Sequence, residues 1–503
     1  MASNSLILLF LFLPITLALY YVDIKSDWVK NYRAVLLIIM SFVFYTWGAT
    51  KWMPLLLLSI LLNYAFIQLW LQIALNNREK GHGLSGFSKL LFVVFVLANV
   101  VLLAYFKYFS NVLPLGISFF VFKILSAWFD IRKSLLESAA FRTDIISEEC
   151  SIGADNFDNA NSVADKLYNK KEFLQTINFN LRNYSLYISF FPELISGPIS
   201  RYKNFTPQIA EAKPSLDRLE SGLRRFLPAL FVKVLIADSI GALRSYLLTG
   251  MSSGLGAAEA WLISIFYTIY IYLDFASYSA MAIGLGDSLG YDVPENFNSP
   301  YSAKTITDFW RRWHMSLSYW FRDYVYIPLG GNRKGLARQL LNISIVWALT
   351  GIWHGNYFNF FLWGLFYGGI LIAEKMYLLK ATEKWPKLIK HALTLIIVNF
   401  GWVLFAFPKT EELFSILKSM FGANSWTNGA ALYTVTANLF LILVAIFCSS
   451  SLFIKFKDAW NKSKFVNSNI GIVLEFIIVV FLFIVTVAFI LDQSFASFLY
   501  FQF

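Results

Sequence analysis

The chain has 503 residues, of which 57% are hydrophobic and 15% are charged. Soluble domains carry about a quarter charged residues, so this composition excludes an ordinary soluble enzyme and indicates that lipid is the main solvent. The net charge of +11 lies mostly in short loops between apolar runs, as in the cytoplasmic loops of membrane proteins, and we expect no nucleic-acid partner. Cys150 and Cys448 show no metal-ligand spacing, so the sequence predicts neither a metal site nor a disulfide.

Uninterrupted apolar runs of about 20 residues, the length that crosses a bilayer, recur along the chain. The first run lacks a basic leader and a small-residue cleavage site, so we interpret it as a retained helix and not as a signal peptide. Together with the Lys/Arg bias of the loops, the runs predict an all-α, polytopic protein with about eleven transmembrane helices plus re-entrant helices. The clearest runs are 6–21, 34–49, 53–75, 90–105 and 470–491.

The segments between the runs differ in character. Residues 134–182 are rich in Asp, Glu, Asn and Ser and are expected to form a polar cytoplasmic insert. Residues 184–199 are apolar but broken by prolines and a glycine, which favours a re-entrant segment over a full span. Residues 287–339 are expected to be a basic cytoplasmic segment, and residues 340–376 a helical hairpin that turns near 355–359. The whole chain, 1–503, is expected to be one membrane domain.

His354 is the histidine whose surroundings most need an explanation. It lies deep in an apolar run and is followed by Gly355, whereas His82 and His391 stand beside charged loop residues. An ionisable side chain at membrane depth is costly and by default indicates a functional site, and imidazole is a suitable general base. The alternative is a histidine that forms a hydrogen bond between helices for packing only.

His314 lies in a segment, 308–324, in which arginines and aromatic residues alternate. One interpretation is an interfacial helix with arginines near lipid phosphates and an aromatic belt. The other is a basic approach for an anionic acyl donor, such as a CoA thioester, whose phosphates arginines would pair. The candidate substrate-binding residues are Asp308, Trp310, Arg311, Arg312, Arg322 and Trp353, with Arg333 as a further phosphate partner.

These motifs resemble those of the membrane-bound O-acyltransferase (MBOAT) family. The resemblance rests on DFWRRWHMSLS at 308–318, YIPLGGNR at 326–333 and GIWHG at 351–355. LPLGISF at 113–119, FFPELISGP at 190–198 and DFASYS at 274–279 agree with it in the same order along the chain. The likeness is to the bacterial branch that O-acetylates alginate or peptidoglycan.

The resemblance implies a multi-pass protein of the cell inner membrane, with His354 and His314 as the essential pair and no bound cofactor. It implies acetyl-CoA as the donor, an acetyl group that crosses the membrane, and a periplasmic O-acetyltransferase partner that receives it. The segment after the Arg-Trp-His motif differs from that of the teichoic-acid D-alanylation branch, so acetyl is expected in preference to D-alanyl. The frequent Phe, Ile, Lys and Asn indicate an AT-rich genome, which slightly favours peptidoglycan over alginate as the acceptor.

Two other functions remain open at this point. A lipid or protein acyltransferase of the same superfamily would consume the donor in the same way, and only the acceptor would differ. A transporter would also explain a polytopic body with buried histidines, although no inverted repeat is visible.

The last six residues, 498–503, contain four aromatic side chains, with Tyr500 among them. Composition alone favours an aromatic anchor at the membrane interface. A similar terminal motif with a central tyrosine occurs in the small partner protein of the D-alanylation branch. That likeness implies that Tyr500 is a transient acyl carrier, which we count with His354 and His314 as a catalytic candidate.

Overall fold

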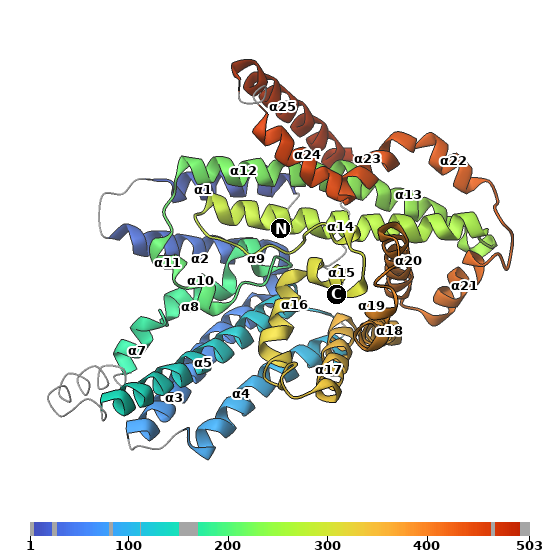
Figure 1. The fold of residues 1–503 in the computed structure, drawn as a ribbon. Coiled ribbons are helices and arrows are strands. Elements are labelled where there is room, and N and C mark those ends of the chain that lie inside the picture. Colours follow the sequence, from blue (N-terminus) through green and yellow to red (C-terminus); the bar gives the residue numbers. More distant parts are fainter. Residues whose placement is uncertain are drawn as a thin grey trace. The chain divides into compact units, whose positions relative to one another are not determined.

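The computed structural model describes residues 5–22, 28–79, 84–110, 112–149, 170–463 and 468–492 (Figure 1). The regular structure of these residues is helical, and they contain no strand. Seven of their helices are long and apolar enough to cross a membrane, or eight if the bent pair 430–449 is one span. The predicted all-α, polytopic fold is therefore confirmed. Two of the predicted crossings, 34–49 and 53–75, are counted within the one candidate span 31–76, and the others fall on helices that are shorter or more polar.

The described residues fall into two compact units. The first unit consists mainly of Leu9–Glu220 with Gly286–Val293. Its helices are η1 (Leu8–Phe12), α1 (Leu13–Tyr20), α2 (Trp28–Ala49), η2 (Thr50–Trp52), α3 (Met53–Glu79), α4 (Gly86–Ala104), η3 (Tyr105–Phe109), α5 (Ile117–Glu149), α7 (Lys170–Thr176), α8 (Leu181–Ser189), α9 (Phe191–Leu194), α10 (Tyr202–Phe205) and α11 (Gln208–Glu211). The first part of the predicted polar insert continues α5, and residues 150–169 lie outside the described residues.

The segment expected to be re-entrant forms two short helices, α8 and α9, which meet at Phe190. Buried charge fixes it within the first unit, because the Glu193 carboxylate lies 2.6 Å from Lys123 Nζ on α5 and also accepts a hydrogen bond from Ser200. Both partners of this ion pair are at most 1% exposed. Removal of one partner would leave an uncompensated buried charge, so we expect this pair to be intolerant of single substitutions.

The second unit consists mainly of Ser221–Leu285 and Pro294–Phe503. Helices α12 (Leu216–Phe231) and α14 (Ala257–Ser288) run across the division between the units. The other helices are η5 (Val232–Ala237), α13 (Asp238–Leu248), η6 (Thr249–Ser253), η7 (Pro300–Ser302), α15 (Ile306–Arg312), α16 (Met315–Phe321), η8 (Arg322–Tyr326), α17 (Leu336–His354), α18 (Phe358–Ala373), η9 (Glu374–Leu378), α19 (Leu379–Ala381), α20 (Lys387–Ala406), α21 (Thr410–Met420), α22 (Ala430–Ala437), α23 (Leu439–Ser449), α24 (Ser451–Lys462) and α25 (Asn469–Asp492).

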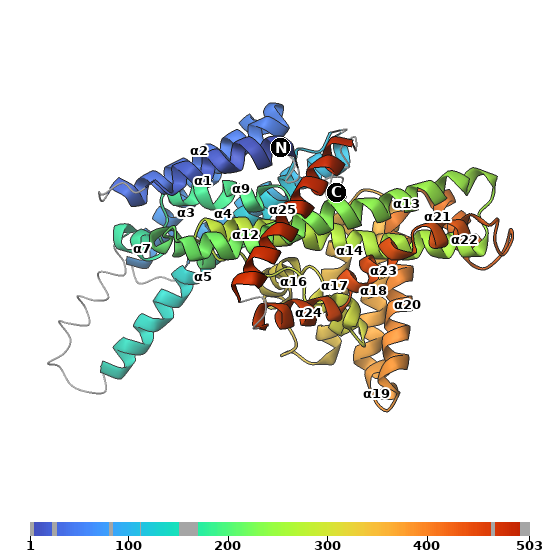
Figure 2. The same ribbon diagram turned by 90° about the horizontal axis from the view of Figure 1, so that it is seen from above.

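Helices α17 and α18 form the hairpin that the sequence predicts, and they lie side by side in both views (Figures 1 and 2). The turn between them comprises residues 355–357. Two glycines let the helices approach, because a Cβ at Gly351 would lie 2.6 Å from the carbonyl oxygen of Phe360 and one at Gly364 would lie 2.6 Å from that of Trp347. The pattern is the small-residue contact typical of membrane helix pairs.

Candidate active site

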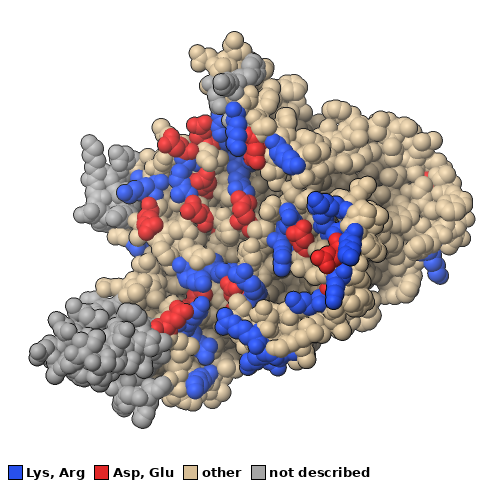
Figure 3. Space-filling model, viewed as in Figure 1, with Lys and Arg blue, Asp and Glu red and all other residues tan. Residues whose placement is uncertain are grey.

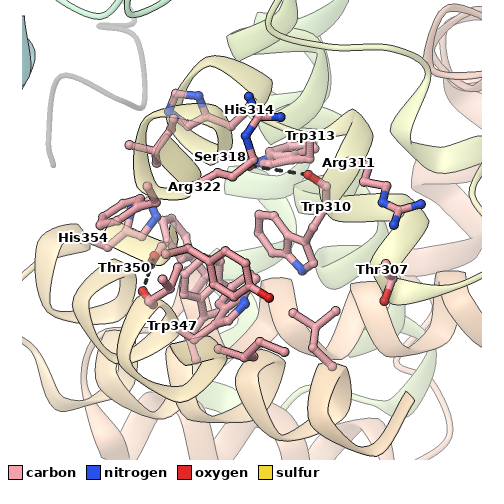
Figure 4. Close-up of a pocket in the computed structure, with 18 of the residues that line it drawn as sticks. Thr307, Trp310, Arg311, Trp313, His314, Ser318, Arg322, Trp347, Thr350 and His354 are labelled. Atoms are coloured by element: carbon pink, nitrogen blue, oxygen red, sulfur yellow. Dashed lines mark hydrogen bonds between the residues drawn. The ribbon is translucent and has the colours of Figure 1, made fainter. Parts of the chain in front are cut away.

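One cavity of about 250 Å³ in the second unit is lined by both His314 and His354 (Figure 4). Helices α15, α16, α17, α18 and α20 all contribute to its wall. The wall is mainly aromatic, with five tryptophans: Trp310, Trp313, Trp347, Trp363 and Trp402. Electrostatic interactions are stronger in such a largely apolar site than in water, which suits chemistry that develops charge.

Helix α15 is held at its N-terminus by its own N-cap residue and by a carboxylate from another part of the unit. The Thr305 hydroxyl accepts a hydrogen bond from the backbone N–H of Asp308. The carboxylate of Glu374, on η9, accepts from the backbone N–H groups of Ile306 and Thr307, at 2.7 and 2.8 Å. A carboxylate at this end also complements the helix dipole. These contacts fix the orientation of α15, whose Trp310 and Arg311 line the cavity.

His314 lies between α15 and α16 in a left-handed backbone conformation, with φ of +43°. This conformation is uncommon for residues other than glycine, and such strain is found at functional sites. The ring is 2% exposed, and its Nδ1 lies 3.0 Å from Oδ1 of Asn296. Burial lowers the pKa of His314 to about 3, so the imidazole is neutral at physiological pH.

His354 is the last residue of α17 and is 3% exposed. Its ring packs edge-on against Trp363 of α18 and Phe405 of α20, with ring centroids 4.8 and 5.1 Å apart. The close contact of α17 with α18 at Gly351 therefore sets the position of a side chain one helical turn further on. The structure places the two predicted histidines on the wall of one cavity.

The four candidate polar residues of the Arg-Trp-His segment divide into two pairs. Arg311 and Arg322 line the cavity, and Nε of Arg322 also lies 2.8 Å from Asp323. Asp308 and Arg312 do not line it; they form an i,i+4 ion pair of 2.9 Å on α15. Consecutive residues on a helix point about 100° apart, so Arg311 and Arg312 have different surroundings although they are adjacent in sequence.

Both candidate tryptophans lie close to the histidines. Trp310 lines the cavity, and its ring meets those of Trp347 and Tyr367 edge-on at 4.7 and 4.8 Å. Trp353 is not a lining residue, but its ring centroid lies 4.6 Å from that of His354 and 6.4 Å from that of His314.

The predicted acyl carrier Tyr500 and the whole terminal motif, 498–503, lie outside the described residues. Arg333 is exposed and does not line the cavity.

The structure also brings in residues that the sequence analysis does not select. Glu374 and Asn296 position α15 and His314, and Trp363 joins the cavity wall. The buried indole N–H groups of Trp310 and Trp363 have no hydrogen-bond partner within the described residues. An unsatisfied buried donor costs about 1–3 kcal/mol, which a bound acceptor would recover.

Exposed basic side chains gather in the part of the second unit that carries the cavity, around α15, η8 and α19, with some acidic side chains among them (Figure 3). We call this group the basic patch; it comprises Arg311, Arg322, Arg333, Lys334, Arg338, Lys375, Lys380, Lys384 and Lys387. Two of its members, Arg311 and Arg322, line the cavity, so the patch reaches the cavity wall.

Residues 42–417 match the sequence model of the membrane-bound O-acyltransferase family, and every lining residue of the cavity lies within this range. The chain belongs to the MBOAT family. The resemblance found in the sequence is thereby confirmed, and the protein is a multi-pass membrane acyltransferase. The alternative of a transporter is set aside, since members of this family are acyltransferases.

Three named relatives show how much of the chain is similar to each branch of the family. The chain is 29% identical to the probable alginate O-acetylase AlgI of Pseudomonas putida over the full length of both proteins. It is 32% identical to the peptidoglycan O-acetyltransferase of Helicobacter pylori, over 84% of this chain and 80% of that protein. The teichoic acid D-alanyltransferase of Bacillus subtilis is 30% identical but aligns with only 44% of this chain and 60% of its own length.

Proposed function

We propose that this protein takes acetyl from acetyl-CoA at the cytoplasmic face of the inner membrane and passes it outward for O-acetylation of an envelope polysaccharide. The observation that carries the proposal is that one and the same aromatic cavity is lined by both His314 and His354. The similarity to O-acetylases over most of the chain supports acetyl in preference to D-alanyl. As the acceptor polymer we favour peptidoglycan over alginate.

The size and charge of the site support a short acyl group on an anionic carrier. A cavity of about 250 Å³ is smaller than the roughly 300–1,000 Å³ that encloses a drug-sized ligand, so it suits the acetyl thioester end of the donor and not the whole of it. The basic patch would pair the phosphates of the remainder, with Arg311 and Arg322 nearest the thioester.

In the proposed reaction His354 removes the proton from an acceptor hydroxyl, whose oxygen attacks the thioester carbonyl carbon. The carbon–sulfur bond then breaks, an oxygen ester forms, and the thiolate takes the proton from the imidazolium, which regenerates neutral His354. The indole N–H groups of Trp310 and Trp363 would donate to the carbonyl oxygen as it becomes negative.

We assign the first acceptor hydroxyl to Tyr500. A phenol with a pKa of about 10 is a good leaving group, so the acyl-tyrosine ester stays activated for a periplasmic O-acetyltransferase partner.

The test compares His354→Ala with His391→Ala in purified protein reconstituted in nanodiscs with labelled acetyl-CoA. His391 does not line the cavity, and its Nδ1 lies 3.0 Å from the carbonyl oxygen of Ala303. We expect His354→Ala to lose at least ~100-fold in acetyl transfer, as for a removed general base, and His391→Ala to retain it. Transfer by His354→Ala within a few-fold of the parent protein would overturn the assignment. Acetyl content of peptidoglycan and of exopolysaccharide, with and without the gene, identifies the polymer.

A further inference from the structure

Asn296 is buried in the loop between α14 and α15 and is 0% exposed. Three donors surround its side-chain oxygen: His314 Nδ1 at 3.0 Å, the Ser316 hydroxyl at 2.9 Å and the Ser316 backbone N–H at 3.3 Å. Its amide nitrogen donates to the Ser279 hydroxyl on α14 at 2.9 Å. The side chain is thus held from α14, α16 and the His314 turn at once.

The backbone N–H of Ser316 decides which way the amide faces. A backbone N–H only donates, so the asparagine atom that faces it must be the carbonyl oxygen. If the amide were turned over, two donors would face each other in a buried site, which is costly. The same oxygen faces His314, so the imidazole nitrogen beside it must carry a hydrogen. A neutral imidazole has one N–H, which leaves the lone pair on Nε2.

Backbone hydrogen bonds make this arrangement rigid. The carbonyl oxygen of Asn296 accepts from the N–H of Met315 at 2.9 Å, and the N–H of Asn298 donates to the carbonyl of Arg312 at 3.0 Å. These two bonds join the loop to the residues on either side of His314. They therefore hold the left-handed turn at His314, which an isolated chain would seldom adopt.

We propose that Asn296 is a positioning residue that holds His314 in the Nδ1–H tautomer, with Nε2 as the basic nitrogen of this cavity-lining ring. The inference rests on the proposed function, whose cavity is lined by His314 together with His354. It gives His314 a defined chemistry, since a neutral His314 held in this way accepts a hydrogen bond at Nε2 and has no second N–H to give. Burial, which keeps the imidazole neutral, supports the same assignment.

Nitrogen NMR of histidine tests the proposal without any turnover. The chain has four histidines, so ¹⁵N-histidine labelling gives a small set of signals, and His314→Gln identifies which belong to His314. In the parent protein we expect the directly bonded proton of His314 on Nδ1, and a proton on Nε2 would overturn the proposal. This readout stands even if the parent protein transfers no acetyl, so failure of the proposed function and failure of this inference are distinguishable.

Variants then test whether Asn296 is the cause. Asn296→Leu keeps the approximate volume but cannot accept, so the Nε2–H tautomer should become populated and kcat should fall at least about tenfold. Asn296→Asp keeps an acceptor and should retain the Nδ1–H tautomer and more activity than the leucine variant. Asn298→Leu is the matched control, because Asn298 is exposed in the same loop and should leave both readouts unchanged. If folded Asn296→Leu shows the same His314 tautomer as the parent protein, Asn296 does not set that tautomer. If the leucine variant does not fold, the test rests on the parent and Asn296→Asp, which should both carry the His314 proton on Nδ1.

Discussion

The contact between α17 and α18 gives the most direct test of how the fold positions His354. A Cβ added by Gly351→Ala would lie 2.6 Å from the carbonyl oxygen of Phe360 and 3.3 Å from Cα of Gly364. Both are backbone atoms, so the helices must separate, and overpacking of this kind costs about 1–3 kcal/mol. Alanine also has a higher helix propensity than glycine, which stabilises the helix by about 1 kcal/mol. This gain is the same for a substitution at any glycine inside these helices.

Gly369→Ala on α18 is the matched control, because a Cβ there meets nothing within 4 Å. Helix propensity cancels between the two alanine variants, so their unfolding free energies in detergent should differ by about 1–3 kcal/mol. Acetyl transfer should fall further in Gly351→Ala, since a shift of about 1 Å in a catalytic group can cost ~100-fold. If both variants unfold at the same temperature and keep the parent kcat, the glycine contact does not position His354.

Two further predictions concern the arginines of α15 and the C-terminus. Arg311→Gln should raise the KM for acetyl-CoA more than it lowers kcat, because phosphate pairing is largely ground-state binding. Arg312→Gln should change thermal stability more than KM, because Arg312 pairs with Asp308 and does not line the cavity. Equal effects of the two variants in steady-state assays would contradict these different roles for Arg311 and Arg312. Tyr500→Phe keeps an aromatic anchor and removes only the hydroxyl. Polymer acetylation should therefore be lost, and labelled acyl should disappear from the C-terminal peptide in mass spectrometry. If polymer acetylation stays at the parent level, Tyr500 is not an acyl carrier and the motif serves as an aromatic anchor.

The parts of this protein that the sequence predicts are those with a repeating physical signal. Apolar runs long enough to cross a bilayer indicate α3, α4 and α25. His354 itself stands out because an ionisable residue at such a position needs a reason. The segment around His314 is recognisable from its alternation of arginine and aromatic residues.

Other parts of the site carry no such signal. Asn296 lies in an irregular loop and becomes significant only because the fold brings His314 back beside it, 18 positions later in the chain. In the sequence, Glu374 is only one charged residue near the end of a helix. In the structure, its carboxylate caps the N-terminus of α15, whose first residue lies 68 positions earlier in the chain. The different surroundings of Arg311 and Arg312 depend on the rotation of α15, and a pattern of adjacent arginines does not give that rotation.

The charges around the cavity constrain how the proton moves in the proposed reaction. Among the described residues that line it there is no aspartate or glutamate, and the charged ones are Arg311 and Arg322. A carboxylate would stabilise an imidazolium, as in the Ser-His-Asp triad, whereas neighbouring arginines disfavour one. The two lining arginines therefore disfavour an imidazolium at His354, which should be short-lived. The departing thiolate is the base that can take this proton at once, since an ordinary thiol such as that of cysteine has a pKa of about 8.5, above that of imidazole. Acyl transfer and release of the protonated thiol are thus coupled through one neutral histidine, which suits a site that must not leave a charge behind in an apolar cavity.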